Sequence, residues 1–284
     1  MGLFNYNIEK YSPKQLVIIP LVILLISVVL LALNMVSTGM PVTPGIDFSG
    51  GTAVTLFTTD SREELQSTFA GYPLVDISEG VNNGFFLKFG AMDDTEFRSL
   101  SALISQKFPD AKVDQIGETF GKTLQSQALL ALVFSFIGMA IVIFVAFRTF
   151  VPAVAVILSA FADMVMTAAT MNIAGIPLSL GTLAALLMLI GYSVDSDILL
   201  TNRVLKRQGK LNEKLTGAFR TGMIMTSTTL AAALAMFVVA WFGSVLILME
   251  ISAVLLIGLV FDVMNTWLTN VGILKWYILK GGGK

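Results

Sequence analysis

Six apolar runs constrain the fold of this chain more than any other feature. Each run is about 20 residues or longer, enough for an α-helix with a rise of about 1.5 Å per residue to cross a hydrocarbon core about 30 Å thick. The first run is too long for the core of a signal peptide and is expected to remain as a span. The sequence therefore predicts a polytopic α-helical membrane protein with spans at Leu16–Met35, Leu124–Phe147, Val151–Met171, Leu178–Leu200, Met223–Phe242 and Val245 to about Leu268.

Basic residues predict how these spans are oriented. Lys and Arg in short loops resist translocation, and here they lie before the first span, after the second, between the fourth and fifth, and after the sixth. We expect that side of the cell membrane, with both termini, to be cytoplasmic. The predicted divisions are a cytoplasmic N-terminus at 1–15, the first span at 16–36, an exported domain at 37–123, and five spans with cytoplasmic loops and C-terminus at 124–284.

The exported domain is acidic, with twelve acidic residues against six basic ones. Its apolar pattern switches between the periods of strands and helices. Strands are expected at 52–58, 74–78, 85–89 and 112–117, and helices at 61–70 and 94–108, the first opening with a capping box of Ser61 and Glu64. The order βαββαβ predicts a ferredoxin-like α+β fold, with two helices on one face of a four-stranded sheet.

The stretch GIDFSGGT stands where the chain enters the exported domain. Gly45 begins the stretch, and Gly50 and Gly51 permit positive φ angles and close approach of backbones. The stretch is predicted to form a tight turn in which Asp47 bonds local amides.

Four aspartates lie inside the apolar runs: Asp163, Asp195, Asp197 and Asp262. An aspartate near the centre of a span costs roughly 2.5 to 3.5 kcal/mol on insertion scales, so each one is a candidate for function. Asp163 is expected near the middle of the third span, and the pair in the fourth span nearer its cytoplasmic end. Asp262 belongs to a polar stripe of the sixth span that must face protein.

Asp195 and Asp197 are expected to point to opposite sides of their helix, since two residues correspond to about 200°. Two interpretations stay open. One or both reach the cytoplasmic headgroups, or Asp195 forms a proton-dependent latch with Arg220, which begins the fifth span. In the second case, the candidates for an ion-coupling relay are Asp195, Asp197, Asp163, Arg220 and Asp262.

The chain has no cysteine and no histidine. A Ser/His/Asp triad, a histidine-ligated metal and thiolate chemistry are therefore excluded. Carboxylates are left as the groups that take up protons. No catalytic residue, metal, cofactor or nucleic-acid partner is predicted.

Two stretches, GIDFSGGT and LLMLIGYSVDSDILLTNR, resemble the SecF family, the smaller half of the SecD/SecF complex of protein export, and the character of the chain suggests an archaeal member. The order of one span, an exported domain and five spans matches the family plan along essentially the whole chain. Gly191, Tyr192, Ser193 and Arg203 stand in the family motif. The acidic position of the bacterial motif falls on Ser196, between the two aspartates.

The resemblance implies half of an RND-like bundle that pairs with a SecD-like subunit in the lipid membrane. It implies that the pair helps a SecYEG-type translocon to export preproteins, coupled to a proton or sodium gradient and without enzymatic activity. Three alternatives remain: an RND-type exporter of small molecules or lipids, a translocase scaffold that uses no gradient, and an intramembrane aspartyl protease.

Overall fold

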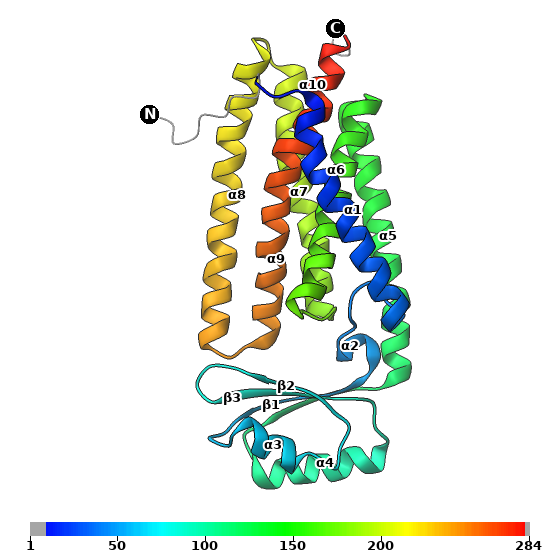
Figure 1. The fold of residues 1–284 in the computed structure, drawn as a ribbon, viewed down its shortest axis with the longest axis vertical. Coiled ribbons are helices and arrows are strands. Elements are labelled where there is room, and N and C mark those ends of the chain that lie inside the picture. Colours follow the sequence, from blue (N-terminus) through cyan, green and yellow to red (C-terminus); the bar gives the residue numbers. More distant parts are fainter. Residues whose placement is uncertain (1–9, 282–284) are drawn as a thin grey trace.

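The structure is a computed structural model that describes residues 10–281, a helical bundle with a small α+β domain at one end (Figure 1). Residues 1–9 and 282–284, which belong to the predicted cytoplasmic termini, lie outside the described part. Within residues 10–281, six helices are long and apolar enough to span a membrane, as predicted. They are α1 (Pro13–Thr38), α5 (Glu118–Phe147), α6 (Phe150–Ala174), α7 (Leu180–Lys206), α8 (Leu211–Phe242), and a last span made of α9 (Leu246–Met264), the π-helix η1 (Asn265–Asn270) and α10 (Val271–Leu279).

The six spans differ in how far the rest of the chain covers them. In the apolar window of each span, 56% of residues are buried in α6 and α7, against 17% in α1 and α8 and 11% in α5. Small residues such as Ala153, Ala160 and Ala185 are fully buried, which lets backbones in the core approach closely. The bundle is thus built around α6, α7 and the last span, with large apolar faces on its outside.

The α+β domain has the predicted order of strands and helices. Its four strands are antiparallel and lie in the order β2-β3-β1-β4, and both helices cover the face of the sheet turned away from the bundle (Figure 1). This order is that of a ferredoxin-like fold. The elements are β1 (Gly51–Phe57), α3 (Arg62–Thr68), β2 (Leu74–Glu79), β3 (Gly84–Phe89), α4 (Asp94–Lys107) and β4 (Lys112–Ile116).

The first helix of this domain begins with the predicted capping box. The Glu64 N–H donates to Ser61 Oγ at 3.3 Å, and the Ser61 N–H donates to Glu64 Oε2 at 2.7 Å. These hydrogen bonds favour the charged carboxylate and lower the pKa of Glu64 below its usual value. The core beneath the sheet contains Leu65, Phe69 and Leu100, all fully buried.

A short helix, α2 (Ile46–Ser49), joins the domain to the bundle. The predicted tight turn is confirmed: Gly50 and Gly51 have φ angles of +75° and +134°, and a Cβ on Gly51 would stand 2.4 Å from the carbonyl oxygen of Phe89. The predicted local partner of Asp47 is wrong. The amides of the turn already bond to carbonyls of the turn, so Asp47 Oδ2 instead accepts from the N–H of Leu180, the first residue of α7, at 2.7 Å.

Candidate functional site

Three of the four intramembrane aspartates meet at the seam between α6, α7 and the last span. Asp163 and Asp197 are 0% exposed and Asp262 is 2% exposed, so neither lipid nor bulk water reaches them. The helices α6, α7, α9 and η1 pack against one another at this seam, and this packing keeps the three aspartates in the protein interior. We call these residues, with the polar side chains that bond to them, the acid cluster.

Asp163, in the middle of α6, connects all three helices. Ser193 Oγ of α7 donates to its Oδ2 at 2.5 Å, and Asn265 Nδ2 of η1 donates to its Oδ1 at 2.6 Å. Both donors are fully buried. Each carboxylate oxygen of Asp163 therefore has a dedicated donor from a different helix.

Asp262 receives hydroxyl groups from two directions. Ser196 Oγ donates to its Oδ1 at 3.1 Å, and Thr266 Oγ1 donates to the same oxygen at 3.2 Å. The two hydroxyl oxygens are themselves 3.1 Å apart. Ser196, which stands at the acidic position of the bacterial motif, thus contacts an acid that comes from the last span.

Asp197 lies one helical turn beyond Ser193 on α7. Asn270 Nδ2 donates to its Oδ1 at 2.7 Å. The hydroxyls of Ser159 and Thr266 lie close to the same carboxylate, yet its Oδ2 has no hydrogen-bond partner. Because Asp197 is buried between helices, the interpretation in which it reaches the headgroups does not hold for it.

The π-helix η1 explains how the last span donates hydrogen bonds to two different aspartates. In a regular α-helix, Asn265 and Asn270 would point about 140° apart. The wider π turn brings both side chains to the same seam, where one bonds Asp163 and the other bonds Asp197. Single π turns are frequent at functional sites. Sequence reasoning missed Asn270, although its position four residues after Thr266 continues the polar stripe.

Among residues 10–281, no basic side chain forms an ion pair with the acid cluster. Within residues 10–281 the one ion pair joins Lys122 to Glu118 on the surface of α5. An unpaired ionised carboxylate in an apolar interior is strongly unfavourable, and two close carboxylates repel each other. Placing three carboxylates in this interior is therefore costly unless their charge is compensated.

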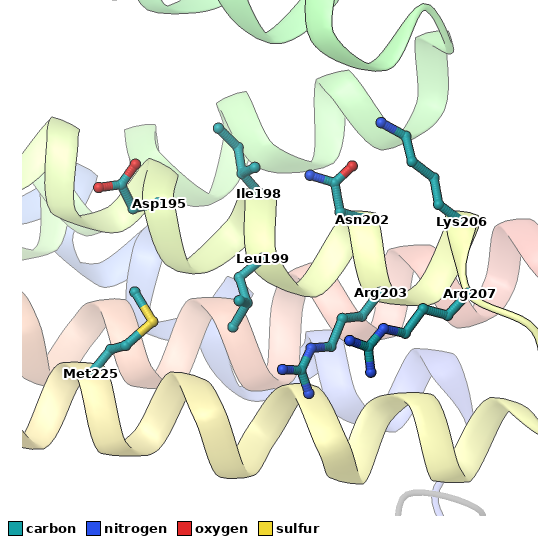
Figure 2. Close-up of a pocket in the computed structure, with 8 residues that line it drawn as sticks. All are labelled: Asp195, Ile198, Leu199, Asn202, Arg203, Lys206, Arg207 and Met225. Carbon is teal, nitrogen blue, oxygen red and sulfur yellow. The ribbon is translucent and has the colours of Figure 1, made fainter.

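Asp195 lies on the other side of α7, as its spacing from Asp197 predicts. It is exposed and lines a cavity of about 560 Å³ between α7 and α8, in which the side chains of Arg203 and Arg207 point toward α8 (Figure 2). Arg203 Nη2 donates to Thr221 Oγ1 of α8 at 2.8 Å. Gly191 and Tyr192 of the same motif are also exposed on this outer face.

Arg220 is exposed on α8, but the described residues include no ion pair between it and Asp195. The structure therefore separates the predicted relay into two groups. Asp163, Asp197 and Asp262 form the acid cluster, whereas Asp195 and Arg220 lie on the outer surface. The segment around α2 that connects the α+β domain to the bundle, which we call the joint, lies at the N-terminal end of α7. It contains Gly45, Asp47, Gly50 and Gly51.

Comparisons with known proteins agree with this architecture. The family described as "Protein export membrane protein SecD/SecF, C-terminal" matches residues 97–280. The chain is 60% identical to the protein-export membrane protein SecF of Methanolacinia petrolearia, over 99% of this chain and 100% of that protein. It is 41% identical to the SecF of Haloferax volcanii, over 96% of this chain and 95% of that protein.

Among solved structures, the chain resembles SecDF, a translocon-associated membrane protein from Thermus thermophilus, with a TM-score of 0.77 at 22% identity. The match covers 98% of this chain and 40% of the SecDF chain, and at this identity it shows the fold alone. The fold and the site define a multi-pass α-helical membrane protein with a seam of buried aspartates in its core. The chain belongs to the SecD/SecF family of protein-export membrane proteins, which are transport proteins and not enzymes.

Proposed function

We propose that this chain acts as the SecF subunit of a SecD/SecF complex that assists Sec-dependent protein export, and that an ion gradient drives it through the acid cluster. The observation that carries the proposal is a set of three buried aspartates without a basic partner in the described residues. Such groups are expensive in a membrane and mark ion pathways. Protons are the first candidate for the ion.

The outer face of α7 and α8 supports a SecD-like partner. Asp195 and Arg220 are both exposed there, although a span that faces lipid does not tolerate charge. A second bundle of the same family would cover them and supply opposite charges. The chain matches 40% of the SecDF chain, so a separate subunit would supply the remaining length. The proposed latch between Asp195 and Arg220 would form or break within that interface.

The helix α7 offers a path from the cluster to the α+β domain. Its first residue, Leu180, is bonded by Asp47 of the joint, and its later turns carry Ser193 and Asp197. A shift of α7 that follows a change of charge in the cluster would move the joint directly. One charge that crosses 100 mV brings about 2.3 kcal/mol, which is enough to change a conformational equilibrium many-fold.

In this proposal both termini face the cytoplasm and the α+β domain lies on the exported side, next to a SecYEG-type translocon. The domain also rests on the bundle through its β2–β3 turn, where Ser244 Oγ donates to the carbonyl oxygen of Val81 at 2.9 Å. With the joint at α2, this second contact lets movements of the bundle orient the domain toward an emerging preprotein.

The test is preprotein export by membrane vesicles that contain the partner subunit, with and without an imposed gradient. Asp163→Asn and Asp197→Asn are expected to reduce gradient-stimulated export at least about tenfold, to the level seen with an uncoupler. Thr167→Val, a buried change on the same helix as Asp163, serves as control and is expected to leave export intact. If export by both aspartate variants depends on the gradient as strongly as export by the wild type, the proposed relay is refuted. If export by the wild type does not depend on the gradient, the result favours the alternative of a scaffold that uses no gradient.

A further inference from the structure

The cavity on the outer face of α7 has a strongly basic end. Three basic side chains of α7 and the residue after it, Arg203, Lys206 and Arg207, line this end, which we call the basic mouth (Figure 2). The connection from α7 to α8 lies at the end of the bundle far from the α+β domain (Figure 1). Within residues 10–281, none of the three side chains forms an ion pair. The basic mouth therefore carries an excess of positive charge.

Two of these side chains repel each other. Arg203 and Arg207 are four residues apart, and both point toward α8, whereas Lys206 points away from it (Figure 2). Like charges at this spacing destabilise a helix. Among the described residues, Asp195 is the one carboxylate that lines the cavity, and it forms no ion pair with either guanidinium. The arginine pair thus offers an unmatched site for an anion.

The cavity continues from the basic mouth as an apolar groove. Ile198 and Leu199 of α7 and Met225 of α8 line this part. Met225 and its neighbour Ile224 are exposed, on a span that buries only 17% of its apolar window. Exposed apolar side chains of a membrane span are stable against acyl chains but not against water. The cavity therefore combines a cationic end with an apolar floor, the combination that an amphipathic ligand requires.

We propose that this cavity binds an anionic phospholipid. Its phosphate would bind Arg203 and Arg207, and one acyl chain would lie in the apolar groove. The guanidinium fork matches phosphate oxygens with parallel hydrogen bonds. Arg203 is already oriented for this role, since its Nη2 donates to Thr221 Oγ1 of α8 at 2.8 Å. Basic pockets between membrane helices bind anionic headgroups in this way, and the groove favours a lipid over free phosphate.

The lipid site and the proposed partner surface use different levels of α7. Lys206 ends the helix, eleven residues or about 16 Å beyond Asp195. The phosphate would therefore lie near the lipid headgroups, and Asp195 lies deeper in the span. The inference goes beyond the proposed function, because lipid binding is a property of this chain alone. Its failure would leave the proposed function untouched.

The test measures the lipids bound by the purified full chain in detergent, by native mass spectrometry, together with its thermal unfolding. Phosphatidylglycerol should bind and raise the unfolding midpoint, whereas phosphatidylcholine, which has no net charge, should do neither. Inorganic phosphate is the third arm, and a rise equal to that with phosphatidylglycerol would overturn the lipid proposal in favour of free phosphate. Arg207→Gln should weaken binding of phosphatidylglycerol about tenfold, or about 1.4 kcal/mol.

Lys210→Gln is the matched control, because it removes the same charge from an exposed residue at the same end of the bundle, outside the lining of the cavity. It should bind the lipid like the wild type. Leu199→Trp fills the apolar groove and should reduce lipid binding although every basic residue remains. Equal weakening by Arg207→Gln and Lys210→Gln, or equal binding of the two lipids, would overturn the proposal. If Leu199→Trp fails to fold, the comparison of Arg207→Gln with Lys210→Gln still decides.

Discussion

The two faces of α7 put neighbouring aspartates into opposite environments. Asp197 is 0% exposed and bonded by Asn270, whereas Asp195, two residues earlier, is exposed at a cavity lined by Arg203 and Lys206. The inner face is covered by other helices of this chain, whereas the outer face carries charged side chains without an ion pair in the described residues. The angular position of each aspartate around α7, and not its position along the chain, therefore decides whether it is buried or exposed and which groups it contacts.

The same asymmetry extends to the whole bundle. The spans that pack on the inner face of α7 bury much of their surface, while α5 and α8 bury little of theirs. Inner-face changes should therefore alter the stability and ion chemistry of the isolated chain. Outer-face changes should matter chiefly when a partner subunit is present.

The largest expected contrast is in chemical accessibility. The chain has no cysteine, so a single cysteine can report on either face. In the purified chain, Asp195→Cys should react with a water-soluble maleimide about a hundredfold faster than Ser193→Cys, because the inner position is reached only through local opening of the bundle. Rates are measured by mass spectrometry. Similar rates at both positions would remove the distinction between the faces, and co-expression with the partner should slow the reaction of Asp195→Cys.

The next effect concerns the stability of the isolated chain. Asn265→Leu keeps the side-chain volume roughly constant but removes the donor to Asp163 Oδ1 and the acceptor for Thr269 Oγ1. It should lower the free energy of unfolding by about 1–3 kcal/mol. Asp195→Asn, the outer-face control, should change it by less than about 0.5 kcal/mol. Denaturant titration of both variants in detergent measures the difference, and a larger loss in Asp195→Asn would contradict the comparison.

The smallest effect is expected at the N-terminal end of α7. Asp47→Ala removes the carboxylate that accepts from the Leu180 N–H, at a helix end where negative charge is favourable. The expected loss is about 0.5–2 kcal/mol, typical of a helix cap. Asp110→Ala changes an exposed acid of the same domain and is the control. Limited proteolysis of the segment around α2 provides the measurement, and equal cleavage of the two variants would show that Asp47 does not hold the joint.

Periodicity and length predicted the six spans and the βαββαβ domain, because both depend on patterns that repeat along the chain. The spacing of Asp195 and Asp197 likewise predicted that they point apart, and the glycines of GIDFSGGT predicted a tight turn. These features depend on local geometry, which a sequence specifies directly.

The partners of the acids could not be predicted in this way. The bond from Asp47 to Leu180 joins residues 133 positions apart, and that from Asn270 to Asp197 joins residues 73 positions apart. The composition of a helix does not say which of its faces packs against which neighbouring helix. The π turn that directs Asn270 toward Asp197 also departs from the regular α-helical period on which sequence reasoning relies. The sequence alone thus determined that the membrane core contains acids. The tertiary structure decided which of them share a seam, because only the packing of α6, α7 and the last span brings their side chains within reach of one another.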